Sequence, residues 1–216
     1  MKTTIICCYY NEIDLLKAKL VKFINFIQKS KIEVEIIIVD NNSTDGTREF
    51  LKDFIKVSNY SNIFCLFNDK NLGKGGSIKK ACEFASGKII CVFDIDEYEF
   101  DDLIIGIIFF NKKKLDLLIG SRILENKKFI YKKNLYGVIV LTKIINLLFK
   151  TDLTDSAGAT KIFNLKLFKS TKVHTSGFDF EFELICKFAK EKFLIGEYPI
   201  KYEPRTYEEG KKINPW

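Results

Sequence analysis

The chain has 216 residues, of which 47% are hydrophobic, with six cysteines and a formal net charge of +7. This length fits one domain with a sizeable core. The cysteines lie mostly in apolar runs and show no paired metal-ligand spacing, which argues against a disulfide framework and indicates free thiols in a reducing compartment. No recognised nucleic-acid-binding motif accompanies the positive charge, so we expect no nucleic-acid partner.

The first half of the chain alternates strand-like and helix-like patterns. Short apolar runs rich in branched residues predict strands, and apolar residues at helical spacing predict the helices between them. This βαβα rhythm indicates a parallel sheet covered by helices. We expect strands at residues 3–8, 34–39, 63–67, 89–93 and 115–119, and helices at 12–28, 47–55, 77–85 and 102–111.

The pattern changes after residue 120, where a basic and apolar segment begins. We see no internal repeat and no convincing domain boundary, so we predict a single domain. The remaining expected elements are a largely helical segment at 123–150, a short strand at 160–164, a helix at 178–190, a strand at 193–198 and a polar tail at 201–216.

Residues 111–150 hold ten Lys or Arg and two Asp or Glu, which leaves the rest of the chain close to neutral. Two interpretations stay open, a solvated lysine-rich face and a basic face toward phosphates or an anionic membrane surface. Within this segment, residues 135–149 form the longest apolar stretch of the chain, which Lys143 interrupts and which is too short to span a bilayer, since that needs roughly 20 residues. They fit a core helix or an interfacial helix at a membrane surface.

Polar clusters follow four of the predicted strands, and parallel strands would gather them at one edge of the sheet, where α/β proteins bind ligands. Asn42, Ser43 and Asp45 can also be an ordinary turn and helix cap. The glycine-rich cluster lacks the GxGxxG and Walker A patterns and can be a plain turn. The clusters are Tyr10-Asn11-Glu12, residues 40–47, residues 71–76 and the Asp94/Asp96 pair.

The fourth cluster is the most informative, because a buried strand ends in two aspartates one residue apart. Carboxylates at such a position contribute little to the stability of the fold and are good ligands for a hard cation. Mg²⁺ is typically held by one or two carboxylates together with substrate phosphates. Asp94 and Asp96 therefore predict metal-assisted chemistry on a phosphorylated substrate.

In this order the clusters resemble family 2 glycosyltransferases with the GT-A fold, of the polyprenyl-phosphate (dolichyl-phosphate mannose synthase-like) type. The resemblance covers nearly the whole chain and implies an α/β domain with a Rossmann-like, mostly parallel central sheet flanked by helices. It also implies a nucleotide-sugar half (1–120), an acceptor half (121–200) and a tail that orders over substrate (201–216). The further matching pieces are Gly120-Ser121-Arg122, Thr154-Asp155 with Lys161, residues 177–181 and residues 205–212.

The resemblance implies roles for individual residues. Asp94 and Asp96 would hold Mg²⁺ or Mn²⁺ against the diphosphate of a UDP- or GDP-linked sugar, and the acceptor would be a polyprenyl or dolichyl phosphate or a glycan. The nucleotide sugar would be bound by Tyr10, Glu12, Asp40, Lys74 and Asp94. The phosphates of donor or acceptor would be bound by Arg122, Arg205 and Lys211.

The acceptor decides whether a general base is needed. A lipid phosphate is already a nucleophile, whereas a hydroxyl must lose its proton to a carboxylate. Among Asp155, Asp179 and Glu181 we prefer Asp155 as the catalytic carboxylate, with Arg122 beside it. The other two can instead be acidic residues at the N-terminus of the 178–190 helix. His174, the only histidine, has no acidic partner nearby in the sequence and is interpreted as incidental.

The chain departs from the family pattern at four positions: Cys8, Asn41, Tyr98 and Ala157, where relatives usually or often have Pro, Asp, Gln and Glu. These departures keep open a degenerate nucleotide-sugar-binding protein. A sugar nucleotidyltransferase and a basic peripheral membrane protein are further alternatives. The main expectation is an inverting, metal-dependent glycosyltransferase. It has no visible signal peptide, and we place it in the cytoplasm, with a peripheral position at the cytoplasmic membrane face as the alternative.

Overall fold

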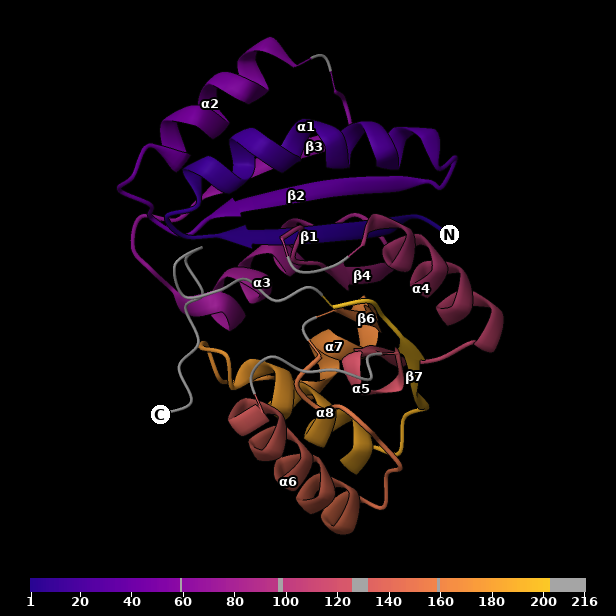
Figure 1. Ribbon diagram of the computed structural model, residues 1–216. Helices are drawn as coiled ribbons and strands as arrows, with labels where there is room; N and C mark the ends of the chain where they lie inside the picture. The colour runs from indigo at the N-terminus through magenta and orange to yellow at the C-terminus, as the bar shows by residue number, and fades with distance from the viewer. Residues whose placement is uncertain (59, 97–98, 126–131, 159, 203–216) are drawn as a thin grey trace.

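The computed structural model describes residues 1–58, 60–96, 99–125, 132–158 and 160–202. Seven strands form one sheet in the order β3-β2-β1-β4-β6-β5-β7, with helices on both faces (Figure 1). β6 runs antiparallel to β4 and β5, and the other strand pairs are parallel. The predicted fold class, an α/β domain with a mostly parallel sheet, is confirmed.

The strands are β1 (Thr3–Tyr9), β2 (Val34–Asp40), β3 (Ile63–Phe67), β4 (Ile89–Val92), β5 (Leu117–Ser121), β6 (Lys161–Asn164) and β7 (Ile195–Pro199). The helices are α1 (Ile13–Lys29), α2 (Thr47–Val57), α3 (Gly73–Phe84), α4 (Phe100–Lys113), α5 (Arg122–Glu125), α6 (Lys132–Phe149), α7 (Leu165–Thr171) and α8 (Phe180–Lys190). Among the helices of the described residues, none is long and apolar enough to cross a bilayer.

Most of the expected elements are present, and the differences have local causes. The glycine-rich segment expected to be a turn is the first turn of α3, which begins at Gly73. The basic segment at 123–150 contains two helices, α5 and α6. α7 was not expected at all; it begins at Leu165 and is capped by Asn164, whose side chain accepts hydrogen bonds from the backbone N–H groups of Lys166 and Leu167.

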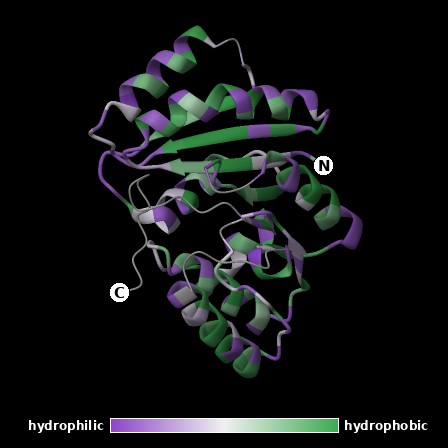
Figure 2. Ribbon diagram, in the orientation of Figure 1, coloured by the Kyte–Doolittle hydropathy of each residue, from purple (hydrophilic) through white to green (hydrophobic). Residues whose placement is uncertain are grey.

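The central strands are apolar throughout because helices cover both faces of the sheet. All seven residues of β2 are buried, and so are six of the seven in β1. One core layer lies against α1 and α4 and the other against α3 and α8. Figure 2 shows the predominantly hydrophobic central strands between helices that carry both hydrophobic and hydrophilic residues.

The cysteines are free thiols, as expected. Cys7, Cys82 and Cys91 are buried in the core, and the other three are half-buried. Burial raises the pKa of Cys8 and of Cys65 to about 12, so these thiols are protonated and poorly nucleophilic at neutral pH.

The common direction of five strands brings the polar clusters together at one end of the sheet. Tyr9 at the end of β1 pairs with Asp40 at the end of β2, and Asp40 pairs with Phe67 at the end of β3. β4 and β5 point the same way, because both are antiparallel to β6. The segments that follow these five strands therefore meet at one edge of the sheet.

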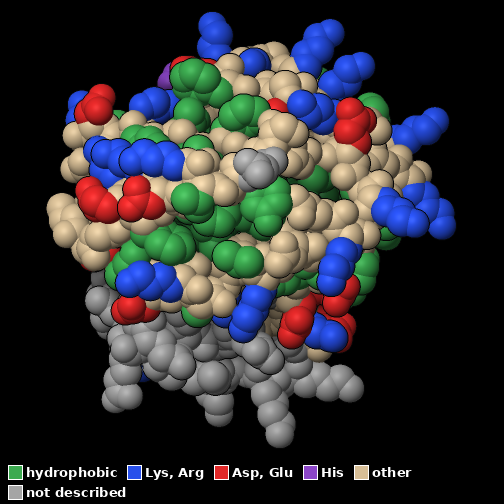
Figure 3. All heavy atoms as spheres, turned by 90° about the horizontal axis from the view of Figure 1, so that it is seen from above, with side chains coloured by type: hydrophobic (Ala, Val, Ile, Leu, Met, Phe, Trp, Pro, Cys, Tyr) green, Lys and Arg blue, Asp and Glu red, His purple; other side chains and the backbone are tan. Residues whose placement is uncertain are grey.

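The face seen from the α2 side has a mixed surface. Hydrophobic side chains spread across its middle, with Lys or Arg and Asp or Glu around them (Figure 3). Exposed apolar residues on α2 and β3 include Val57, at 81% exposure, and Phe64, at 49%. Interspersed charges of both signs are typical of an ordinary solvated surface.

At the opposite end of the strands, the buried carboxylate of Glu35 on β2 connects neighbouring segments. Its oxygens accept hydrogen bonds from the Ser86 N–H at 2.6 Å, the Ser86 hydroxyl and the Thr4 hydroxyl, and Lys2 Nζ lies 3.3 Å away. Burial alone would raise the pKa of Glu35, but the bonds from Ser86 and Thr4 outweigh burial and lower it from 4.5 to about 2.

We expect Glu35→Gln to lower the free energy of unfolding at pH 7 by roughly 3 kcal/mol, the linkage value of this pKa difference. The Glu35 pKa is lower in the folded chain, so its contribution is complete above pH 4.5 and is lost as the pH falls toward 2. Urea unfolding at pH 7, 4.5 and 3 measures this, with exposed Glu33→Gln as the control. An equal pH dependence in Glu35→Gln and wild type would contradict the assignment.

Candidate active site

The nucleoside end of the predicted site is organised by Asp40, the fully buried last residue of β2. Arg48 from α2 donates from Nε to Asp40 Oδ2 at 2.7 Å and from Nη2 to the Asn68 carbonyl oxygen. The other oxygen, Asp40 Oδ1, accepts the Ser43 N–H at 3.2 Å. Asp40 is therefore already paired with a cation in the site, and Arg48 was not predicted as its partner because no local sequence pattern links the two residues.

The loops after β1 and β2 are locked together. Ser43 Oγ accepts the Asn11 N–H at 2.9 Å, and Asp45 Oδ2 accepts the Ile13 N–H at 3.0 Å, which satisfies a donor at the start of α1. In return, Asn11 Oδ1 accepts the Thr44 N–H at 2.8 Å. Ser43 and Asp45 therefore stabilise a turn and a helix start, which was one of the two interpretations of this cluster.

Tyr10 and Glu12, which are predicted to bind the nucleotide sugar, lie in the first of these two loops. Tyr10 is 38% exposed and Glu12 is half-buried. The Glu12 N–H donates to Thr47 Oγ1 at 3.0 Å, so the backbone that carries both side chains is fixed to the first residue of α2.

Asn41, one of the departures from the family pattern, uses both ends of its amide. Its Nδ2 donates to Asn71 Oδ1 at 2.8 Å, and its Oδ1 accepts from Asn68 Nδ2 at 3.0 Å and from the Leu72 N–H at 2.8 Å. An aspartate could not donate to Asn71. The asparagine at position 41 is therefore matched to its neighbours in this chain.

The glycines that open α3 permit a close approach to the start of α8. A Cβ on Gly75 would lie 2.5 Å from the Cβ of Phe180. The backbone instead makes two bonds there, from the Gly75 N–H to the Gly177 oxygen at 3.2 Å and from the Gly76 N–H to the Ser176 oxygen at 2.9 Å. This contact places Lys74 beside the side chains of α8.

Lys74 joins a row of alternating charges that runs from the site into the core. Its Nζ lies 2.8 Å from Asp94 Oδ2 and 3.0 Å from Glu181 Oε1. Glu181 Oε2 lies 3.2 Å from Nζ of Lys161, a side chain 1% exposed that also donates to the Gly158 carbonyl oxygen. The row thus ends in a fully buried ammonium group.

The row fixes the protonation of its members. Burial would lower the pKa of Lys74, but the carboxylates of Asp94 and Glu181 outweigh burial and raise it. Burial would raise the pKa of Glu181, but the ammonium groups of Lys161 and Lys74 lower it. For Lys161, burial dominates and its pKa is lowered. Glu181 is therefore a weak base, which disfavours it as a proton acceptor.

Asp94 and Asp96 have the donor chemistry that a hard divalent cation requires. The intervening Ile95 is fully buried, whereas both aspartates are half-buried at the end of β4. Lys19 Nζ donates to the Asp96 carbonyl oxygen at 3.1 Å, which holds this turn on α1. In the part of the chain that the structure describes, no group of three or more potential ligands is present, so substrate oxygens and water would complete the coordination. Tyr98 lies outside the described residues.

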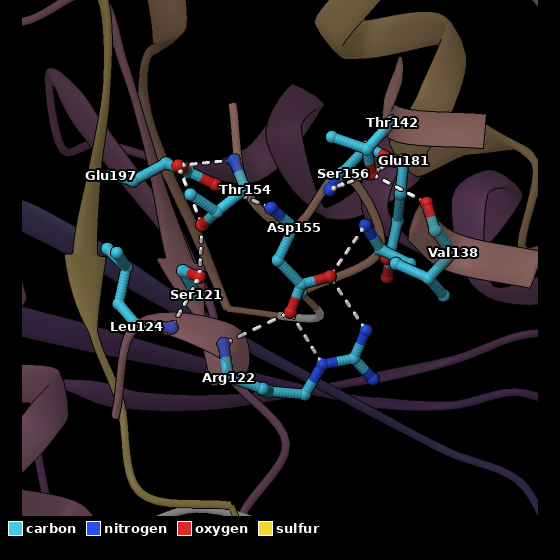
Figure 4. A network of polar contacts seen from close by, with 12 residues as sticks. Ser121, Arg122, Leu124, Val138, Thr142, Thr154, Asp155, Ser156, Glu181 and Glu197 are labelled. Carbon is cyan, nitrogen blue, oxygen red and sulfur yellow. Dashed lines mark hydrogen bonds and ion pairs between the residues drawn. The ribbon is translucent and has the colours of Figure 1, made fainter. Parts of the chain in front are cut away.

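The predicted acceptor side is built around the fully buried Asp155 (Figure 4). Arg122 donates to it from Nε at 2.7 Å, from Nη2 at 2.8 Å and from the backbone N–H at 3.0 Å. The Arg122 guanidinium also lies over the Tyr202 ring, 5.2 Å from its centroid. Both carboxylate oxygens of Asp155 are thus used to hold Arg122.

Glu197 on β7 holds the segment that carries Asp155. Its oxygens accept the Thr154 N–H at 2.7 Å and the Asp155 N–H at 2.8 Å, and the Thr154 hydroxyl at 2.9 Å (Figure 4). Burial raises the pKa of Glu197, and the bonds from Asp155 and Thr154 counter this only in part. Glu197 was not among the predicted site residues, although an acidic residue inside the strand predicted at 193–198 was a signal for it.

Asp179 and His174 make local contacts near the start of α8. Asp179 Oδ1 accepts the Gly177 N–H at 3.1 Å, a local turn just before α8. The His174 N–H donates to Glu183 Oε2 at 2.9 Å. Arg205 and Lys211 lie outside the described residues.

The model of one protein family, described as glycosyl transferase family 2, matches residues 4–171 of this chain. The chain belongs to this family. The family that the sequence motifs resemble is therefore confirmed.

Two relatives of this family member are dolichyl-phosphate beta-glucosyltransferases. The one from Dictyostelium discoideum is 26% identical, and the alignment covers 96% of this chain and 67% of the relative. The one from Saccharomyces cerevisiae is 28% identical, with 89% of this chain and 64% of the relative covered. The chain therefore spans about two thirds of the length of these relatives.

Solved structures share the fold at low identity. The mannosyltransferase PcManGT from Pyrobaculum calidifontis, in complex with GDP-Man and Mn²⁺, has a TM-score of 0.63 at 16% identity, covering 91% of this chain and 54% of that one. Glucosyl-3-phosphoglycerate synthase from Mycobacterium tuberculosis, in complex with Mn²⁺, UDP-glucose and phosphoglyceric acid, has a TM-score of 0.68 at 14% identity, covering 96% and 74%. These likenesses confirm the GT-A fold.

Proposed function

We propose that this chain transfers a sugar, with inversion, from a UDP- or GDP-linked donor to a polyprenyl phosphate such as dolichyl phosphate. The observation that carries the proposal is that Asp94, paired with Lys74, and Asp96 follow β4 at the same sheet edge at which the anchored Arg122 follows β5. The family match and the dolichyl-phosphate names of the two relatives support it.

On the donor side, Asp94 and Asp96 would hold Mg²⁺ or Mn²⁺, which when bound supplies positive charge to the leaving diphosphate. The presence of Mn²⁺ with sugar nucleotides in the two solved structures supports a divalent metal. Lys74 is kept protonated by two carboxylates and adds a fixed positive charge beside Asp94. Tyr10, Glu12 and Asp40 would contact the nucleoside from the locked loops after β1 and β2.

On the acceptor side, Arg122 would bind the lipid phosphate. Arginine suits this task because its planar guanidinium presents five N–H donors. In this proposal Asp155 is a positioning residue, because both of its oxygens accept bonds from Arg122. Arg205 and Lys211 would add positive charge from the tail.

The chemistry then needs no strong base. A phosphate oxygen of the acceptor attacks the anomeric carbon and forms the new C–O bond, while the bond from that carbon to the donor diphosphate breaks. The electron pair leaves with the diphosphate. Inversion of an α-linked donor gives a β-linked product, in agreement with the names of the two relatives.

We further propose that the chain acts at the cytoplasmic face of a membrane as a peripheral protein, because a polyprenyl phosphate is confined to the bilayer.

Thermal unfolding with UDP, GDP and their glucose and mannose derivatives, with and without Mn²⁺ or Mg²⁺, tests the donor half of the proposal. A ligand at 100 times its Kd stabilises the native state by about 2.7 kcal/mol. We expect one nucleotide series to raise the unfolding temperature and the metal to enlarge the shift. No shift with any nucleotide in either metal would overturn the donor site, and a shift without turnover would favour a degenerate binding protein.

A further inference from the structure

The outer face of α6 is apolar where a surface helix is usually polar. Five apolar side chains on this face are exposed, with Leu147 at 81% and Tyr136 at 71%. Their spacing of three and four residues places them in one stripe along the helix. The face, named here the α6 outer face, consists of Tyr136, Val140, Ile144, Leu147 and Leu148.

The inner side of α6 is also apolar and is packed on the domain. Ile145 is buried there, and Leu141 and Phe149 pack against the same core layer. A helix on the surface of a domain usually turns one apolar face to the core and a polar face to solvent, whereas α6 has apolar side chains on both faces. A continuous exposed apolar stripe therefore marks a contact surface for something outside the described residues.

The charges around the stripe indicate what the occupant is. Lys132, Lys133 and Lys143 lie in α6, Lys150 follows it, and residues 132–150 contain no Asp or Glu. Lys133, Lys143 and Lys150 are exposed. An apolar face edged with lysines complements an anionic bilayer surface, where apolar side chains enter the headgroup boundary and ammonium groups meet lipid phosphates. Two copies of the face would bring lysines against lysines.

The inner side of α6 is bonded to the acceptor side of the active site. Thr142 and Ser156 share a hydrogen bond of 2.8 Å between their hydroxyls, and the Ser156 N–H donates to Thr142 Oγ1 at 3.1 Å (Figure 4). Ser156 follows Asp155, the partner of Arg122. A helix with its side chains is about 10 Å across, so the outer face lies roughly one helix thickness from the segment that holds Arg122.

We propose that the α6 outer face docks on an anionic bilayer and thereby presents Arg122 to phosphates at the membrane surface. The second clause rests on the proposed function, whereas the docking itself requires no transferase activity. Figure 1 places α6 at the end of the molecule away from α2, so docking would leave the α2 side in solvent.

Vesicle flotation of the whole chain tests the proposal. We expect it to float with an equimolar mixture of phosphatidylcholine and phosphatidylserine and to float less with phosphatidylcholine alone. Leu147→Asp should lower partitioning onto the anionic vesicles by roughly tenfold or more. Val57→Asp is the matched control, because Val57 is equally exposed, also lies in the last turn of a helix and is on α2; its binding should equal wild type.

Each outcome has a defined meaning. Equal binding by Leu147→Asp and Val57→Asp, or no binding of wild type to anionic vesicles, would overturn the docking surface. A wild-type dimer in lipid-free buffer that Leu147→Asp converts to a monomer would also overturn it, in favour of self-association. The nucleotide-dependent thermal shift of Leu147→Asp should match that of wild type, which separates failure of docking from failure of the donor site and from misfolding.

Discussion

Replacement of Asp96 by Ala should abolish the metal-dependent part of nucleotide binding and lower turnover on the order of 10²–10³-fold, the usual effect of losing one group that stabilises transition-state charge. Only Asp94 would then remain of the paired carboxylates at the end of β4. The measurements are the thermal shift with nucleoside diphosphate across a metal titration, and the rate of diphosphate release from the sugar nucleotide.

The matched control for this variant is Asp101→Ala, which removes an exposed carboxylate a few residues away in the first turn of α4. It should keep the metal-dependent shift and the turnover of wild type. Unchanged metal dependence in Asp96→Ala would remove Asp96 from the proposed metal site. A loss of the metal-independent part as well would indicate a wider disruption of the turn that Lys19 holds through the Asp96 carbonyl.

Arg122→Ala should lower the free energy of unfolding by about 3–5 kcal/mol, because it leaves the carboxylate of Asp155 buried without its cation. Asp155 is fully buried, whereas 17% of the Arg122 side chain is exposed. Asp155→Ala should therefore cost less, since the stranded guanidinium can be hydrated. The double variant should be more stable than Arg122→Ala alone. Urea unfolding of the three variants measures this asymmetry.

Activity adds a second test of the same pair. Arg122→Ala and Asp155→Ala should both raise the KM for a polyprenyl phosphate and leave the nucleotide-dependent thermal shift near that of wild type. Arg122→Lys keeps the charge but loses the bidentate contact and should behave like a weaker form of Arg122→Ala. An unchanged KM in Asp155→Ala would contradict the positioning role of Asp155, and a larger loss of stability from Asp155→Ala than from Arg122→Ala would contradict the argument from their burial.

The sequence was informative about the elements that depend on local pattern. Strands buried on both faces appear as continuous apolar runs, so β1, β2 and β4 could be located closely. Because these strands are parallel, the meeting of Asp40 and Asp94 at one edge could also be expected. The antiparallel insertion of β6 between β4 and β5 could not, since a short strand carries no signal of its direction.

The partners within the site depend on tertiary contacts that no local pattern encodes. Arg48 reaches Asp40 only because α2 folds back over the end of β2, and Glu197 reaches Asp155 only because β7 pairs with β5. The first turn of α3, which begins at Gly73, is bonded to residues 176 and 177, about 100 positions along the chain. The sequence thus predicted which side chains gather, and the structure supplied the residues that hold them.

The most direct test of the central claim is transfer from a radiolabelled sugar nucleotide, UDP-glucose first, to dolichyl phosphate in anionic vesicles. We predict that label moves into the organic-extractable lipid, that transfer requires both a divalent metal and the lipid phosphate, and that Asp96→Ala lowers it on the order of 10²–10³-fold. Label that stays in the nucleotide sugar for every donor tested, with the metal and the lipid phosphate both present, would contradict the claim.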